Sequence, residues 1–150
     1  MQNMIEVKNF SKHYGEFKAV DDISFNVGEG EIFAFLGPNG AGKSTTINTL
    51  CTITDKTEGS MRINGHDVSS QKDRVRKDIG IVFQESTLDA KLTVEENLQL
   101  HCNFYKVPGN EAQNRIRFAL ELVEMTNWRK ALVGSLSGGM KRRVEIARGL

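Results

Sequence analysis

One stretch of the chain, residues 31–50, constrains the possible folds more than any other. A nearly continuous apolar run, Glu31–Leu36, is typical of a strand buried on both faces of a sheet. It leads directly into Gly-Pro-Asn-Gly-Ala-Gly-Lys-Ser at positions 37–44, and Lys43–Leu50 has helical character. Glycine, four residues, glycine, lysine and serine between a strand and a helix form the phosphate-loop pattern. The order predicts an α/β fold that binds phosphate.

Each residue type in this loop suits a triphosphate. Glycines let the backbone approach the phosphates closely, while amide groups and the helix N-terminus provide a positive concave site. Lys43 is expected to bridge the β- and γ-phosphates, Ser44 to ligate Mg²⁺, and Thr45 to meet the α-phosphate. The predicted nucleotide contacts here are Gly37, Pro38, Asn39, Gly40, Ala41, Gly42, Lys43, Ser44 and Thr45. The alternatives are a glycine-rich turn that merely caps a helix, and a dinucleotide site, whose glycine spacing this loop lacks.

The remaining pattern divides into strands first and helices later. Period-two alternation predicts strands near residues 5–10 and over Val20–Val27, and a turn-rich stretch at 59–67 suggests another. A second buried strand is expected at Ile79–Phe83, ending at Gln84. Helices are expected near Gln71–Lys77, at Thr93–Tyr105 after a capping box, at Glu111–Met125 with an apolar stripe, and after Leu136.

Composition excludes several classes of protein. Lysine and arginine number 20 against 19 aspartates and glutamates, so the net charge of +1 creates no field that would attract nucleic acid or an anionic membrane. The apolar runs have strand length, far below the roughly 20 residues that span a bilayer. No secretion signal precedes them, and Cys51 and Cys102 read as small apolar residues in a reducing compartment. These features predict a location on the cytoplasmic side.

A second motif adds a family resemblance. Leu-Ser-Gly-Gly-Met at 136–140, followed by Lys-Arg-Arg-Val-Glu-Ile-Ala-Arg-Gly-Leu, resembles the signature motif of ATP-binding cassette (ABC) ATPases, and its distance from the phosphate loop is right for that family. The resemblance implies a P-loop NTPase fold with an N-terminal antiparallel β-subdomain, a partial parallel core sheet and an α-helical subdomain. Residues 1–150 would form the N-terminal part of one ATP-binding domain: 1–92 the nucleotide-binding core, 93–135 the helical subdomain, and 136–150 the signature loop and helix.

The resemblance also implies roles for single residues. Tyr14 matches the aromatic side chain that stacks on adenine, and Gln84 matches the glutamine that touches Mg²⁺ and the attacking water, so Lys43 and Gln84 are the catalytic candidates. Ser137, Gly138 and Gly139 resemble residues that clamp the γ-phosphate of ATP held by a second, head-to-tail subunit. The alternatives are an ordinary tyrosine, a polar residue at a strand end, and a capped helix, which explains the serine and one glycine but not two.

The basic residues that follow the signature have a simpler reading. Lys141, Arg142 and Arg143 could suggest nucleic acid, but such runs are more often a solvated helix face. Helical spacing predicts that Glu145 pairs with Lys141 and with Arg148. No nucleic-acid partner is therefore expected.

The functional expectation is an ATP-binding subunit of an ABC transporter that uses ATP and Mg²⁺. Its partners would be a second ABC ATP-binding domain and transmembrane permease subunits, with the chain peripheral on the cytoplasmic side of the membrane. Met140 and the residues after it resemble drug-export and antibiotic-resistance transporters. The family's magnesium-holding aspartate, its water-polarising glutamate and a later histidine would follow Leu150, so the 150 residues look truncated and are expected to hydrolyse ATP poorly alone. Two alternatives stay open: a soluble ABC protein acting on DNA or ribosomes, and a nucleotide-binding fragment without catalysis.

Overall fold

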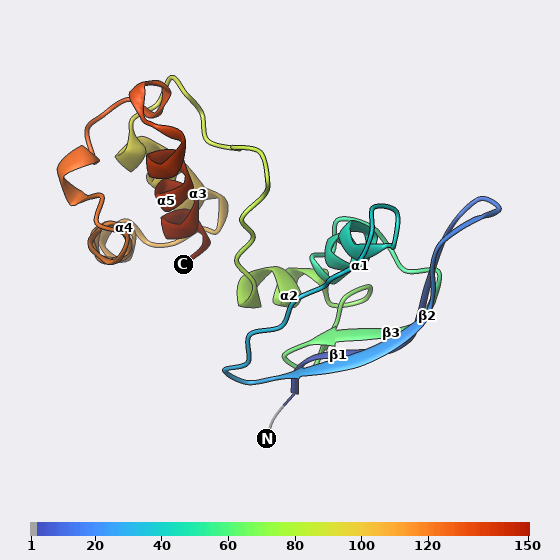
Figure 1. Ribbon diagram of the computed structural model, residues 1–150. Helices are drawn as coiled ribbons and strands as arrows, with labels where there is room; N and C mark the ends of the chain where they lie inside the picture. Colours follow the sequence, from blue (N-terminus) through green and yellow to red (C-terminus); the bar gives the residue numbers. More distant parts are fainter. Residues whose placement is uncertain (1–2) are drawn as a thin grey trace. The chain divides into compact units, whose positions relative to one another are not determined.

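The computed structural model describes residues 3–150 and divides the chain into two compact units, Met1–Ile79 and Gly80–Leu150 (Figure 1). The units separate where the chain's character changes, because the named strands all lie before residue 79 and the longest helices after it. The boundaries predicted at residues 92 and 135 stay predictions. They separate subdomains with different roles, whereas the two units are separated by how the chain packs.

The first unit is built on a four-stranded antiparallel sheet with the strand order β2-β1-β3-β4. Its strands are β1 (Asn3–Tyr14), β2 (Phe17–Gly28), β3 (Glu58–Ile63) and β4 (His66–Asp67). Asn64 and Gly65 join β3 to β4 with φ of 48° and 76°, which is the backbone twist that a two-residue hairpin turn requires. The strands predicted at the start of the chain are therefore confirmed.

A bulge in β1 changes which side chains are buried. Asn9 has a φ of 49° and is exposed, while its neighbour Phe10 is completely buried. Strict period-two alternation over residues 5–10 would place Asn9 on the same face as Ile5 and Val7, and Phe10 on the opposite face. The prediction fails at this point because the register of the β1–β2 pair shifts between Val7 and Phe10.

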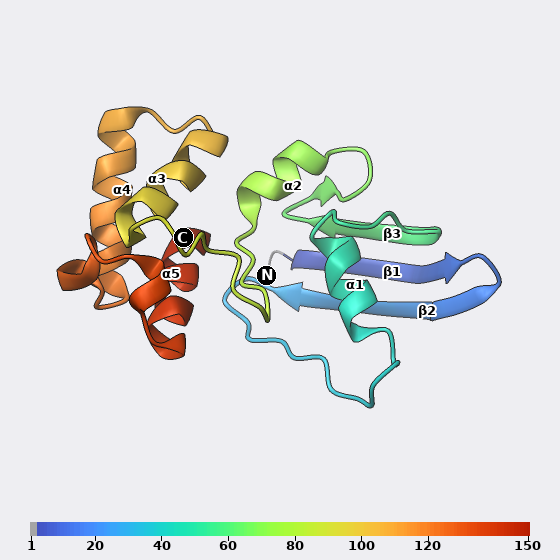
Figure 2. The same cartoon turned by 90° about the horizontal axis from the view of Figure 1, so that it is seen from above.

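Two helices complete the first unit. Helix α1 (Lys43–Leu50) lies over one face of the sheet, as Figure 2 shows from above. Helix α2 (Lys72–Asp78) contacts β4 and buries Val75. Leu50 and Val75 join Val7, Phe10 and Met61 in one apolar core, so α1 is anchored by its C-terminal end while its first turn stays accessible.

The two buried strands predicted at residues 31–36 and 79–83 are not formed. Ile32 is fully exposed, Leu36 is 91% exposed, and neither segment pairs with a strand within residues 3–150. Phe33 and Phe35 instead pack around Phe25, with ring centroids 5.1–5.2 Å apart. A strand buried on both faces needs hydrogen-bonded neighbours, which the described residues do not supply, so the predicted partial parallel sheet is wrong for this structure.

The second unit is helical. It contains α3 (Val94–Phe104), α4 (Gly109–Leu122) and α5 (Gly138–Gly149), with short 3₁₀ turns at Thr126–Trp128 and Val133–Ser135. The predicted helices are confirmed, although α4 ends three residues before the expected Met125. One apolar core joins them, made of Val94, Leu98, Ile116, Ala119, Leu120, Met125, Val133, Leu136, Val144 and Ala147. Across residues 3–150, the structure has no helix with the length and apolar character needed to cross a bilayer.

Candidate functional site

The phosphate-loop sequence forms an open loop between residue 36 and the start of α1. Gly40 and Gly42 have φ of 84° and 80°, a region that favours glycine. A Cβ on Gly42 would stand 2.6 Å from the carbonyl oxygen of Ala19 and 2.8 Å from Cγ2 of Val20, whereas nothing lies near Gly40. Gly42 is therefore required by contact with β2 as well as by its backbone angle, and this contact fixes where α1 begins.

The first turn of α1 is suited to an anion. Helix geometry leaves the first amide groups of a helix without intrahelical acceptors. Gly42 has no side chain to cap them, and the first turn contains no acidic residue that would compete with a phosphate. The first backbone bond of the helix runs from the Thr46 amide to the Gly42 carbonyl at 2.9 Å. The amides of Lys43, Ser44 and Thr45 thus remain available at the positive end of the helix.

The Lys43 ammonium group lies over the loop. Its Nζ donates to the carbonyl oxygens of Gly37 at 2.7 Å and Pro38 at 2.6 Å. The cation is thereby held above the backbone that the motif uses for phosphate. A phosphate could replace these neutral acceptors with a charged one, and charge-assisted hydrogen bonds are about twice as strong.

The residues after the lysine are fixed differently. The Ser44 side chain is exposed and Thr45 is half-buried. Two buried threonines, which the sequence reasoning missed, stabilise the first turn of α1. Thr46 Oγ1 donates to the Gly42 carbonyl at 2.9 Å, and Thr49 Oγ1 donates to the Thr45 carbonyl at 2.8 Å. Their helical spacing gives a weak hint of such bonds, because threonine commonly bonds the carbonyl four residues earlier.

Tyr14 ends β1 in the same unit. Its side chain is 49% exposed, beside the turn that joins β1 to β2. The Lys12 ammonium lies 4.9 Å from the ring centroid, a cation–π distance, and also donates to the carbonyl oxygen of Asp55 at 2.6 Å. The ring is thus held by a fixed cation and offers exposed aromatic surface.

The other predicted site residues belong to the second unit. Gln84 is exposed and lies in the irregular segment before α3, so it does not end a strand as predicted. Ser137 caps α5, and its hydroxyl oxygen accepts from the Met140 amide at 3.3 Å. Gly138 and Gly139 are exposed on the first turn of α5, where an added Cβ on either would meet nothing within 4 Å. The structure therefore brings residues 37–45 together as one loop and Ser137–Gly139 as one helix start.

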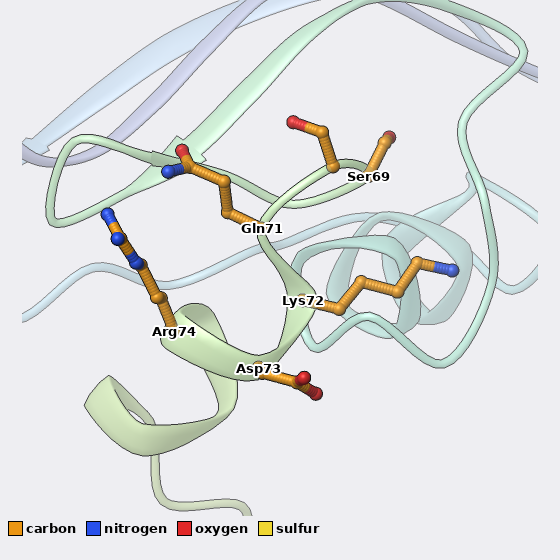
Figure 3. A pocket seen from close by; sticks show the side chains of 6 residues that line it. Ser69, Gln71, Lys72, Asp73 and Arg74 are labelled. Atoms are coloured by element: carbon orange, nitrogen blue, oxygen red, sulfur yellow. The ribbon is translucent and has the colours of Figure 1, made fainter.

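A hollow that sequence reasoning did not predict lies at the start of α2. Figure 3 shows that its side chains do not converge, because Lys72 and Asp73 point away from Gln71 and Arg74. Beside it, burial raises the pKa of Asp67, but bonds from the amides of Ser69 and Ser70 and from the Ser70 hydroxyl outweigh burial and leave this pKa below its usual value. The Asp67 carboxylate therefore stabilises the turn at Ser69 and Ser70 through these hydrogen bonds. Across residues 3–150, no cluster of three His, Cys, Asp or Glu residues could hold a metal ion.

Comparison with known protein families decides the assignment. The ABC transporter family matches residues 20–150, which include both the phosphate loop and the signature sequence. The chain belongs to the ABC transporter family. The predicted P-loop NTPase α/β class with its antiparallel subdomain is confirmed, because solved ABC structures share this fold.

Several relatives agree with this assignment. The Nod factor export ATP-binding protein I of Burkholderia thailandensis is 40% identical over 146 residues, 97% of this chain and 48% of that protein. The linearmycin resistance ATP-binding protein of Bacillus subtilis is 38% identical over 98% of this chain and 47% of its own length. The doxorubicin resistance ATP-binding protein of Mycobacterium tuberculosis is 40% identical over 97% and 45%. The chain spans about half the length of the curated relatives it matches.

Solved ABC proteins have the same architecture. The structure of cbiO1 from Clostridium perfringens, part of the ABC transporter complex cbiONQ, superposes with a TM-score of 0.87 at 28% identity and covers 99% of this chain and 61% of that one. An ATP-binding subunit of an ABC transporter gives a TM-score of 0.84 at 29% identity, covering 97% of this chain and 61% of that one.

Proposed function

We propose that the chain is the ATP-binding part of an ABC transporter subunit, in which residues 37–45 hold the triphosphate of Mg·ATP. One observation carries this proposal: α1 begins at a glycine cap with uncapped amides, no acid in its first turn and the Lys43 ammonium above the loop. Backbone amides, a helix dipole and one cation converge on a short stretch of chain. A polyphosphate is the ligand that this chemistry fits.

Further contacts with the nucleotide and its metal ion are proposed for Tyr14, Ser44 and Gln84. Tyr14 would stack on the adenine ring through its exposed surface, which is worth about 1–3 kcal/mol. The exposed Ser44 hydroxyl is an oxygen donor of the kind that Mg²⁺ takes. In the second unit, the exposed Gln84 side chain offers an amide oxygen of the same kind. Bound Mg²⁺ would supply charge neutralisation at the β- and γ-phosphates.

Calorimetry with Mg·ATP tests the loop directly. We expect a binding heat for the parent chain that disappears in Lys43→Ala, because the charge above the phosphates is lost. Lys77→Ala is the matched control, since Lys77 is an exposed lysine on α2 of the same unit and should bind as the parent does. Tyr14→Ala should weaken binding about 5- to 150-fold and Tyr14→Phe should not. Equal heats for Lys43→Ala and Lys77→Ala in folded samples would refute the proposal.

A second part of the proposal concerns assembly. Two such chains would meet head to tail, so that Ser137, Gly138 and Gly139 of one contact the γ-phosphate held by the other. The support is that Gly138 and Gly139 have no positive φ and no neighbour that would exclude a side chain, so the described chain itself does not need glycine there.

Sedimentation with and without Mg·ATP tests this assembly. We expect ATP to favour a dimer and Ser137→Arg to prevent it, while a binding heat that depends on Lys43 remains detectable. Asn110→Arg adds the same charge at an exposed position of α4 and should dimerise normally. An ATP-dependent dimer that survives Ser137→Arg would contradict the head-to-tail arrangement.

The third part is transport. The relatives named for Nod factor export and for resistance to linearmycin and doxorubicin support a role in export, with ATP hydrolysis by the whole protein driving transmembrane partners from the cytoplasmic side of the membrane. Hydrolysis by the full-length protein reconstituted with its membrane partner should require Lys43. Turnover by a Lys43→Ala protein would exclude this mechanism.

A further inference from the structure

The segment that carries Gln84 is attached to helix α5. We call residues 80–87 the strap. Its amide at Thr87 donates to Oε1 of Glu145 at 3.1 Å, and its carbonyl at Phe83 accepts a hydrogen bond from Nη1 of Arg142. These two contacts lie on either side of Gln84, so the strap is held both before and after that residue.

Glu145 is unusual among the charged residues of α5 because its side chain is only 4% exposed. A carboxylate removed from water is costly unless it is paired and hydrogen-bonded. Glu145 meets this requirement with the Thr87 amide on one oxygen and Nη1 of Arg142, at 3.4 Å, on the other. The pairing predicted from helical spacing, with Lys141 and Arg148, is not the one the structure has.

Arg142 links the two contacts. The same Nη1 atom reaches both the Phe83 carbonyl and Glu145, so one guanidinium joins the strap to the buried carboxylate. Arg148 adds a longer contact of 3.5 Å to the Thr87 carbonyl. At the start of the strap, a Cβ on Gly80 would collide with the Gly149 carbonyl, which means that the strap backbone touches the end of α5.

We propose that Glu145 and Arg142 are positioning residues that fix Gln84 relative to the helix whose first turn carries Ser137, Gly138 and Gly139. A phosphate that binds at the start of α5 would then affect the position of Gln84, because the helix is rigid and the contacts of Glu145 and Arg142 join it to the strap. The proposal deepens the proposed function and rests on it, because Gln84 acts only if the chain binds and hydrolyses ATP.

Amide hydrogen exchange tests the tethers without nucleotide. Glu145→Ala should accelerate exchange at Thr87 by roughly ten- to hundredfold, the effect of losing a bond to a charged acceptor, while the amides of α4 stay protected. Glu145→Gln keeps an acceptor oxygen and should accelerate it less. Arg143→Ala is the matched control on the same helix, because Arg143 is half-exposed and pairs with Glu124 rather than with the strap. Unchanged exchange at Thr87 in Glu145→Ala, or in Glu145→Leu should the first variant not fold, would overturn the proposal.

Kinetics of the full-length protein test the positioning role. Arg142→Ala and Glu145→Gln should lower kcat about ten- to hundredfold, the cost of misplacing a reacting group, with KM for ATP within about twofold of the parent. The double variant should be no worse than the more damaging single one. Faster exchange with a normal kcat would overturn the proposal, because the strap would be tethered without affecting Gln84. A parent protein without Lys43-dependent hydrolysis would instead refute the proposed function, and the positioning role would fall with it, whatever the exchange rates show.

Discussion

Substituting the glycines of the phosphate loop separates the effect of backbone angle from the effect of close contact. Gly40 and Gly42 have nearly the same φ, 84° and 80°. An alanine in the left-handed region costs about 1–2 kcal/mol at either position. Only at Gly42 would the new methyl meet atoms, at 2.6 Å from the Ala19 carbonyl oxygen and 2.8 Å from Cγ2 of Val20. Overpacking of this kind adds about 1–3 kcal/mol.

We therefore expect Gly40→Ala to lower the free energy of unfolding by about 1–2 kcal/mol and Gly42→Ala by about 2–5 kcal/mol. Denaturant unfolding followed by circular dichroism measures both, and equal denaturant slopes would show that the folded and unfolded states stay comparable. Equal costs for the two variants would refute the reasoning, since the contact with β2 would then have no energetic effect.

Other variants test other elements. Thr93→Ala should lower the free energy of unfolding by about 1 kcal/mol, because the Thr93 hydroxyl accepts a hydrogen bond from the Glu96 amide and caps α3. Thr93→Ser keeps the hydroxyl and should restore the stability. Equal stability of the parent and both variants in thermal unfolding would show that the cap does not stabilise the chain. Burial, and secondarily the charge of Arg148, lowers the pKa of His101 in the folded chain. The unfolded chain therefore binds more protons, and the free energy of unfolding should fall as the pH drops below about 6.5. Unfolding measured between about pH 7.5 and 5.5 should show a weaker pH dependence in His101→Gln. Gly138→Ala should leave stability unchanged or raise it by up to about 1 kcal/mol yet weaken ATP-dependent dimerisation, so a normal dimer would argue against phosphate contact there.

Local rules predicted the elements whose determinants are adjacent in sequence. The capping box at Thr93–Glu96 forms as expected, with the Thr93 amide donating to Glu96 Oε2 at 2.7 Å. Asn64 and Gly65 form the hairpin turn, and the phosphate loop runs into α1 at the expected lysine. In the capping box and the hairpin turn, the interacting groups lie within four residues of one another, so the sequence alone contains the whole interaction. The start of α1 depends in addition on the contact of Gly42 with Ala19 and Val20 of β2.

The failures have distant causes. The apolar run at 31–36 has the composition of a buried strand, but a strand exists only where partner strands bond to it, and Ile32 and Leu36 stay exposed. Glu145 has basic residues at helical spacing on both sides, yet it pairs with Arg142 and with the Thr87 amide, 58 positions away. Helical spacing alone does not show that the Thr87 amide, which lies in another segment, donates to the Glu145 carboxylate.

The two helix starts that sequence analysis linked to phosphate differ in what requires their glycines. At α1, Gly42 is needed by the chain itself, because of its positive φ and its contact with β2, so its presence would be explained even without a ligand. At α5, Ser137 already caps the helix and neither Gly138 nor Gly139 is needed by its backbone angle or by a neighbour within residues 3–150. Glycine inside a helix is less stable than alanine by about 0.5–1 kcal/mol. Two glycines in one first turn therefore weaken α5, and no contact within the described residues compensates for this loss. The proposed contact with a γ-phosphate would account for both glycines, because a residue without a side chain lets a ligand come close to the backbone. The proposal of a partner subunit therefore rests more on these two glycines than on the phosphate loop.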